Sequence, residues 1–252
     1  MKKWNIASGL AILLAGSLYI GWAWWSWPLW PLVLFVALWL GFTAYASLTL
    51  PARIYVDAVC SGPKGTMALT FDDGPHPQIT PALLDHLKAE NIKASFFCIG
   101  KYVEAFPALA KRIVDEGHAI GIHSQHHHWT WGFIGEDHAE KEIRTCAEAI
   151  QRTTGQRTSL FRPPFGVTNP NIAAAVKTTG VTTIGWDLRT FDTARSPAEV
   201  MKRISTRPKP GTIAVLHDTQ PGTLELVKGI IAHCRQHGIE LVRCDAHLRP
   251  NA

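Results

Sequence analysis

The sequence predicts an α/β protein with a parallel barrel or barrel-like sheet, preceded by an N-terminal helical hairpin in a membrane. Short apolar segments alternate with helix-like segments between residues 67 and 242, a pattern typical of parallel strands with helices outside them. Seven or eight such units, with no glycine-rich phosphate-binding sequence after the first strand, favour a barrel over a doubly wound sheet. The hairpin is indicated by residues 4–52, which contain no Asp, Glu, Lys or Arg.

The charge-free segment is too long for one membrane crossing. As a single helix it would extend about 74 Å, against roughly 30 Å of hydrocarbon core. Pro28 and Pro31 lie among tryptophans near its middle; proline interrupts helices and tryptophan favours the membrane interface. We therefore predict helices over residues 6–25 and 32–50, and divide the chain into a membrane hairpin (1–52), a linker (53–65) and a folded domain (66–252).

A cleaved signal peptide followed by a buried helix is the alternative for this segment, because Lys2 and Lys3 precede an apolar run. The hydrophobic part of a signal peptide spans only about 7–15 residues, much less than is found here. Together with Arg53 and Lys64, the two lysines favour both ends of the hairpin in the cytoplasm. Five cysteines without a CxxC spacing fit reduced thiols. We expect a membrane protein of the bacterial inner-membrane type, with the side of the folded domain left open.

The net charge of +5 does not indicate a nucleic-acid partner. The basic residues are dispersed, and no arginine-rich run or alternation of basic and aromatic residues occurs. A solvated surface explains this charge, and the membrane is the partner expected for the hairpin.

Within the domain, the short apolar runs predict the strands and the longer amphipathic segments predict the helices. Strands are expected over residues 67–71, 94–99, 118–122, 160–161, 181–186, 212–216 and 239–242. Helices are expected over residues 80–90, 107–116, 136–153, 171–179, 197–206 and 223–237. Thr80 and Pro81 suit the N-cap and first position of the first of these helices.

Ionisable side chains follow these strands directly, at Asp72-Asp73, His123 to His128, Arg162, Asp187 and His217-Asp218. The carboxyl ends of the strands of a parallel barrel share one face, where active sites form. Asp72 and Asp73 precede Gly74-Pro75, and a solvated turn is the ordinary interpretation of such a sequence. Buried at the end of a strand, however, two carboxylates need a cation or hydrogen bonds.

The histidines favour a cation. His123 and His127 have the i, i+4 spacing that brings two side chains to one side of a helical turn, and imidazole with carboxylate binds Zn²⁺ or a similar divalent ion. His126 and His128 compete for the place of the second histidine. Three protein ligands leave a position open for catalysis. Surface positions, or core positions with a hydrogen-bonded ring, are expected for the other histidines considered, which are His76, His118, His138, His233 and His237.

Two further side chains are expected at the same face. His217 follows the apolar strand over residues 212–216, and a general acid is its natural role. Arg162 precedes Pro163-Pro164, which stiffen the loop that presents it, and its guanidinium can hold a carboxylate in fixed geometry. The alternative for Arg162 is a structural ion pair.

Four ordered segments resemble the motifs of the polysaccharide deacetylases (carbohydrate esterase family four, the NodB homology domain). They are residues 70–75 (TFDDGP), 123–127 (HSQHH), 162–166 (RPPFG) and 216–217 (LH), and the resemblance extends over about residues 67–242. It implies a distorted (β/α) barrel of seven or eight strands and a divalent metal, zinc with cobalt, nickel or manganese as alternatives. The residues implied are Asp73, His123 and His127 as metal ligands, Asp72 as catalytic base, His217 as catalytic acid and Arg162 as the residue that orients Asp72.

Three positions depart from the family pattern: Arg189 for an Asp that pairs with the arginine in many relatives, Thr193 for a common Trp, and Val215 for a Leu of the acetyl pocket. We hypothesise that Asp187 or Asp192 contacts Arg162 instead. The change at Val215 bears on the preferred size of the acyl group.

The expected function is metal-dependent removal of an N-acetyl or other N-acyl group from a carbohydrate, either an amino-sugar polymer or a lipid-linked glycan. A deformylase or amidase acting on a lipid-linked sugar or another N-acyl compound is the second hypothesis. The third is a non-catalytic glycan-binding scaffold, which the intact set of ionisable residues disfavours.

Overall fold

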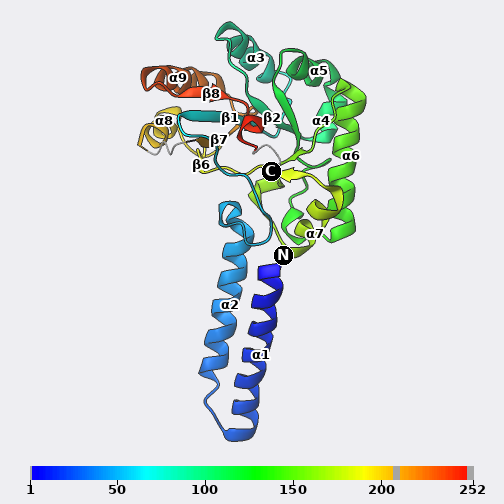
Figure 1. Cartoon of the computed structure of the whole chain (residues 1–252), viewed down its shortest axis with the longest axis vertical. Coiled ribbons are helices and arrows are strands. Elements are labelled where there is room, and N and C mark those ends of the chain that lie inside the picture. The colour runs from blue at the N-terminus through cyan, green and yellow to red at the C-terminus, as the bar shows by residue number, and fades with distance from the viewer. Residues whose placement is uncertain (1, 207–210, 249–252) are drawn as a thin grey trace.

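The computed structural model describes residues 2–206 and 211–248; residues 249–252, the end of the predicted domain, lie outside them. A curled parallel sheet is covered by helices on its outer side, and a two-helix hairpin extends away from this domain (Figure 1). The strands are β1 (Thr66–Asp72), β2 (Ser95–Cys98), β3 (Ala119–Ile122), β4 (Leu160–Phe161), β5 (Thr182–Thr183), β6 (Leu188–Arg189), β7 (Thr212–His217) and β8 (Glu240–Val242).

The α-helices are α1 (Lys2–Trp25), α2 (Trp30–Leu48), α3 (Thr80–Ala89), α4 (Gly100–Ala105), α5 (Pro107–Asp115), α6 (Glu136–Thr154), α7 (Pro170–Thr179), α8 (Pro197–Thr206) and α9 (Thr223–Gln236). Short 3-10 helices are η1 (Leu50–Ala52), η2 (Trp131–Phe133), η3 (Pro164–Gly166) and η4 (Cys244–His247).

The sheet has the order β5-β4-β3-β2-β1-β7-β6, with all pairs parallel and β8 added at the amino end of β1. No strand pairing joins β5 to β6 in the described part of the chain. The segment after the hairpin lies in this gap, since Val59 bridges to Ile184 and Ser61 bridges to Thr212. The distorted (β/α) barrel predicted from the sequence is confirmed, as a barrel that does not close fully.

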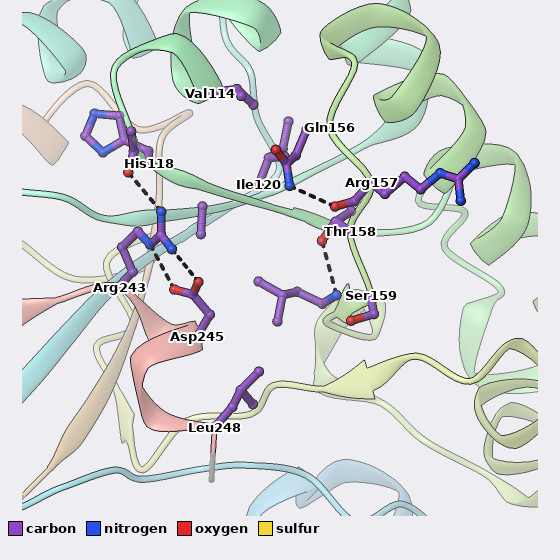
Figure 2. Close-up of a pocket in the computed structure, with 13 residues that line it drawn as sticks. Val114, His118, Ile120, Gln156, Arg157, Thr158, Ser159, Arg243, Asp245 and Leu248 are labelled. Carbon is purple, nitrogen blue, oxygen red and sulfur yellow. Dashed lines mark hydrogen bonds and ion pairs between the residues drawn. The ribbon is translucent and has the colours of Figure 1, made fainter. Parts of the chain in front are cut away.

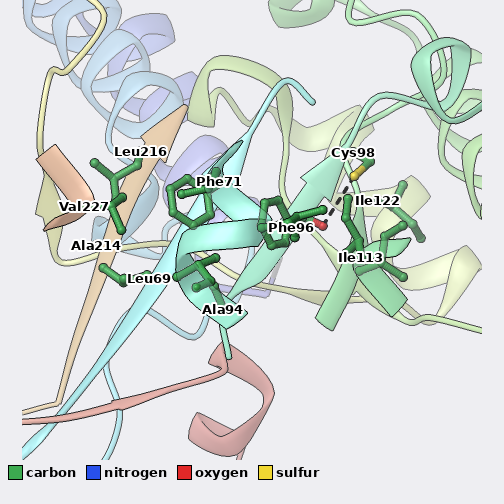
Figure 3. Close-up of a cluster of buried hydrophobic side chains, with 14 of the residues drawn as sticks. Leu69, Phe71, Ala94, Phe96, Cys98, Ile113, Ile122, Ala214, Leu216 and Val227 are labelled. Atoms are coloured by element: carbon green, nitrogen blue, oxygen red, sulfur yellow. Dashed lines mark hydrogen bonds between the residues drawn. The ribbon is translucent and has the colours of Figure 1, made fainter. Parts of the chain in front are cut away.

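Strand β1 shows how the sequence positions the site. Successive side chains of a strand point to opposite faces. Met67, Leu69 and Phe71 pack in the large cluster between sheet and helices, part of which Figure 3 shows. The alternate residues Thr70 and Asp72 therefore lie on the inner side of the curled sheet. An ionisable group at the end of β1 is thus directed into the mouth of the barrel.

The two hairpin helices are long and apolar enough to cross a membrane. Their apolar spans are Trp4–Trp25 and Trp30–Leu48, of which only 11% and 6% is buried. The hairpin is attached to the domain near its open end: the rings of Trp4 and Tyr55 lie 4.6 Å apart, and the backbone N–H of Thr168 donates to the carbonyl of Ser47 at 3.1 Å. The end of α2 is therefore held against the domain.

A hollow of about 330 Å³ lies at the amino ends of the strands, away from the ionisable cluster (Figure 2). Two of its charged groups pair with each other, because Arg243 Nη2 and Asp245 Oδ2 form an ion pair at 2.6 Å. His118 is a core histidine, as the sequence suggested. Its Nδ1 accepts from the N–H of Ala94, and burial lowers the pKa of its ring to about 4. The chemistry therefore concentrates at the other end of the barrel.

Candidate active site

The two adjacent carboxylates enter one cleft from the end of β1. Asp72 is its last residue, and Asp73 follows with φ of 75°, a left-handed conformation that non-glycine residues seldom adopt. This turn places the second carboxylate in the cleft that the first also lines. Two neighbouring residues of a strand would otherwise point to opposite faces.

Asp73 meets two imidazoles. Its Oδ1 lies 3.4 Å from Nε2 of His123 and 3.4 Å from Nε2 of His127, and the candidate ligand atoms of the three side chains all lie within 4.8 Å of one another. His123 follows β3 directly, but the helical turn expected between the histidines is wrong. His127 reaches the site through a loop in which Ser124 and His127 have φ of 61° and 52°.

The donor chemistry of these residues fits a bound cation. His123 Nδ1 lies 2.8 Å from the carbonyl oxygen of Arg162, and because a carbonyl only accepts, Nδ1 carries the ring proton. In a neutral ring the unprotonated Nε2 then faces the Asp73 carboxylate, so that two acceptors oppose each other. A divalent ion between them removes this conflict, and a carbonyl partner on the outer ring nitrogen is usual for metal-binding histidines.

The electrostatics of the cluster agree with this geometry. Burial raises the pKa of Asp73, but the hydrogen bond from a protonated His123 ring and the charges that His123, His127 and His217 carry when protonated outweigh it and hold this pKa below its usual range. Burial and the neighbouring His123 lower the pKa of His127 to about 4. A neutral imidazole and an ionised carboxylate are the forms that bind metal.

The two competing histidines point elsewhere. His126 Nδ1 lies 2.7 Å from Glu142 Oε1, and His128 Nδ1 lies 2.7 Å from the hydroxyl of Thr130. Sequence spacing left three candidates for the second histidine, and the structure brings only His127 of the three to Asp73.

Arg162 is completely buried, and its guanidinium donates four hydrogen bonds. Its Nη1 donates to Asp72 Oδ1 at 2.8 Å and to the hydroxyl of Thr70 at 2.7 Å. Nε and Nη2 donate to the carbonyls of Ile184 and Gly185, and the guanidinium lies 4.1 Å from the centroid of the Phe97 ring. Arg162 thus holds Asp72 in one orientation.

The hypothesis that Asp187 or Asp192 pairs with Arg162 is wrong, since among the described residues the ion pair of Arg162 is with Asp72. Asp187 Oδ1 accepts from the backbone N–H of Ile213 at 2.8 Å. Asp192 binds His217 twice, through the backbone N–H at 2.7 Å and through ring Nδ1 at 2.9 Å.

Asp192 is therefore a functional candidate that the sequence reasoning assigned to the wrong partner. Burial alone would lower the pKa of His217, but the bond to Asp192 and the charges of Asp72, Asp192 and Asp73 raise it to about 9. No local sequence pattern marks this pair, because it depends on strand register: Arg189 of β6 lies beside Val215 of β7, so the residues just after Arg189 come next to His217.

A cleft of about 240 Å³ joins these groups; its lining residues are Asp72, Asp73, His123, His127, Phe165, Gly166, Trp186, Arg189, Phe191, Thr193, Val215 and His217. The three positions that depart from the family pattern all lie in this lining. The Arg189 guanidinium is 5.7 Å from the Trp186 ring centroid and 5.1 Å from that of Phe191. Asp218 is buried behind the site, where the hydroxyl of Thr80 donates to it and burial raises its pKa to about 7.

The fold and the site together define a class of protein: a parallel β/α barrel with a candidate metal-binding group of one carboxylate and two imidazoles, and with the Asp72–Arg162 and His217–Asp192 pairs beside it, at the carboxyl ends of its strands. The family model for polysaccharide deacetylase matches residues 61–184. A chitooligosaccharide deacetylase of Bradyrhizobium sp. is 32% identical over 181 residues, which cover 71% of this chain and 81% of that protein. The chain belongs to the polysaccharide deacetylase family.

Other relatives are longer than the shared region. A peptidoglycan-N-acetylglucosamine deacetylase of Bacillus cereus is 34% identical over 66% of this chain, which spans 61% of its length. For the peptidoglycan deacetylase PgdA of Listeria monocytogenes the identity is 33% over 71% of this chain, but only 38% of that protein is spanned. Among solved structures, the Bc1960 peptidoglycan N-acetylglucosamine deacetylase superimposes with a TM-score of 0.70 at 30% identity, covering 76% of this chain and 92% of that one.

Proposed function

We propose that the protein is a metal-dependent deacetylase that hydrolyses the N-acetyl group of an amino sugar and is held in a membrane by its N-terminal hairpin. The observation that carries the proposal is the convergence of three arrangements on one cleft: the Asp73, His123 and His127 cluster, the Asp72–Arg162 pair and the His217–Asp192 pair. The names of the relatives point to the same substrate class, since they are deacetylases of peptidoglycan and chitooligosaccharides.

The proposed metal ligands are Asp73, His123 and His127. When bound there, a divalent ion, with zinc as the first candidate, lowers the pKa of a water molecule and polarises the acyl oxygen. In the reaction a C–O bond forms between a water molecule and the acyl carbon, and the C–N bond to the sugar breaks, which gives acetate and a free amine.

The residues of the chain move the protons in this scheme. Asp72, oriented by Arg162 through Oδ1, takes a proton from the attacking water as general base. His217 is held by Asp192 at Nδ1, and its Nε2, 4.0 Å from Asp73 Oδ2, gives a proton to the departing nitrogen. That proton is needed because an amine anion is too poor a leaving group to depart alone.

The membrane anchor is supported by the surface of the hairpin. Both helices expose large apolar side chains along their length, among them Leu13, Trp24, Trp30 and Leu38 at 64–80% exposure. Burying such surface in lipid is favourable by about 25 cal/mol per Å². Crossing helices of about 20 residues also match the thickness of the hydrocarbon core.

The purified full chain, loaded with zinc, should release acetate and free amine in equal amounts from tri-N-acetylchitotriose or from N-acetylated peptidoglycan fragments. An N-formyl analogue in the same assay distinguishes a deformylase, because Val215 lines the cleft where the acyl group would lie. Failure of the zinc-loaded protein to release acetate from any N-acetylated amino sugar would refute the proposed activity.

A further inference from the structure

The exposed apolar surface of the folded domain is concentrated at one place. Among the described residues after the hairpin, the exposed large apolar side chains are Trp129, Phe133, Phe165 and Phe191, and Phe133 is 90% exposed. The first three line one groove of about 590 Å³, while Phe191 lines the active-site cleft. A contiguous apolar patch of this kind on a soluble surface marks an interaction site.

The other wall of the groove is the end of membrane helix α2. Thr43, Ala44, Ser47 and Leu48 line it, and no residue of the lining is charged. Helix α2 has 19 residues, about 28 Å of helix, which is close to the roughly 30 Å of a hydrocarbon core. With α2 across a membrane, its last turns and the groove beside them lie at the membrane boundary.

The groove is held in this place by contacts between hairpin and domain. The bond from Thr168 N–H to the Ser47 carbonyl ties the end of α2 to the segment that follows η3. Tyr45 and Leu48, 55% and 63% exposed, continue the apolar surface along α2. The groove is thus continuous with the surface of α2 that lipid would cover.

One side chain connects the groove to the catalytic cleft. Phe165 lines both, and its ring centroid lies 4.5 Å from that of His127. Its backbone has φ of 59°, outside the conformations that a phenylalanine favours. The ring of Phe165 therefore lies between a ligand in the groove and the candidate metal ligand His127.

We propose that this groove binds the hydrocarbon chain of a membrane-anchored amino-sugar substrate, so that the enzyme acts on a lipid-linked saccharide. The inference rests on the proposed function and specifies its substrate class. A hydrocarbon chain suits the groove because the lining offers apolar surface without charge, and because one wall already belongs to a helix in contact with lipid. The sugar at the head of such a chain reaches the cleft past Phe165.

The test compares free tri-N-acetylchitotriose with its hexadecyl glycoside, using the full zinc-loaded chain in phosphatidylcholine nanodiscs. We expect kcat/KM for the alkylated sugar to exceed that for the free sugar at least about tenfold, since contact with ~60 Å² of apolar surface already accounts for that factor. The double variant Trp129→Ser/Phe133→Ser should lose this advantage and change turnover of the free sugar less than about twofold. The matched control is Trp24→Ser, an equally exposed tryptophan (80%) in the last turn of α1, where the hairpin turns; this variant should keep the advantage.

The outcomes separate the two proposals. Equal turnover of both sugars by the unaltered protein would overturn the groove assignment and leave the deacetylase intact. If the double variant keeps the higher kcat/KM for the alkylated sugar, the groove binds bilayer lipids alone. If its kcat/KM falls equally for both sugars, the groove has a structural role. Either result overturns the inference. No turnover of either sugar would refute the proposed function and the inference with it.

Discussion

The His127→Ala variant is expected to lose its bound metal ion and at least about a thousandfold in kcat/KM, whereas His128→Ala keeps both. His127 Nε2 lies 3.4 Å from Asp73 Oδ1, while the neighbouring His128 is exposed and bonded to Thr130. Loss of a metal ion removes several kcal/mol of transition-state stabilisation, and each ~1.4 kcal/mol is tenfold in rate.

The measurement is metal content per chain by inductively coupled plasma mass spectrometry, together with acetate release. His126→Ala is a second control, because its ring is bonded to Glu142 rather than directed to Asp73. Metal retained by His127→Ala but lost by His126→Ala or His128→Ala would show that the wrong histidine has been assigned to the ion.

The Asp72→Asn variant should separate catalysis from metal binding. Its amide oxygen still accepts from Arg162 in place of Asp72 Oδ1, so the fold and the metal content should be unchanged. The amide cannot take a proton from water, and general base catalysis contributes about 10²–10⁴-fold. We expect kcat to fall by that factor, with about one metal ion per chain and a folded protein of lower Tm, because the buried Arg162 guanidinium then lacks a charged partner.

Asp85→Asn is the matched control, since this carboxylate is exposed and, within the described residues, forms its ion pair with Arg112. Exposed pairs of this kind contribute about 0–1 kcal/mol, so activity and Tm should stay close to those of the unaltered protein. If Asp72→Asn hydrolyses the substrate at the unaltered rate, Asp72 is not the base. Loss of the metal ion or of the folded state in Asp72→Asn would instead assign the Asp72–Arg162 pair to structure.

The placement of the site could be predicted from the sequence because it depends on strand ends. Asp72, His123 and His217 each stand at or just after the end of an apolar run, and parallel strands bring such ends to one face whatever the details of register. The apolar periodicity that identifies strands is local. For this reason the existence of most elements was also predicted correctly, including helices α3, α5, α6, α7 and α9.

The partners within the site could not be predicted in the same way. Whether Asp192 meets Arg162 or His217 depends on how β6 pairs with β7, a long-range register that no local pattern encodes. His127 reaches Asp73 through left-handed backbone at Ser124 and at His127 itself, whereas i, i+4 spacing suggested a helical turn. Side-chain partners thus follow from tertiary geometry.

Differences in the fold have the same origin. Strand β5 is two residues long, where a strand over residues 181–186 was expected, because its partner β4 ends at Phe161. Ile184 still donates to the Phe161 carbonyl, but Gly185 donates to Val59 of the segment after the hairpin. Helix α4 has only six residues and follows β2 directly, too short for a clear amphipathic period. The groove beside α2 combines residues far apart in the chain, and its sequence carries no continuous motif.

Diffraction data from a zinc-loaded crystal, collected at the zinc absorption edge, test the proposed cation site most directly. We expect one anomalous peak in the cleft, about 2.0–2.2 Å from an Asp73 carboxylate oxygen and from Nε2 of His123 and His127. Asp72 and His217 should line the same cavity. A peak held by other residues, or an ion that leaves Asp73 outside its coordination sphere, would contradict the site on which the proposed hydrolysis depends.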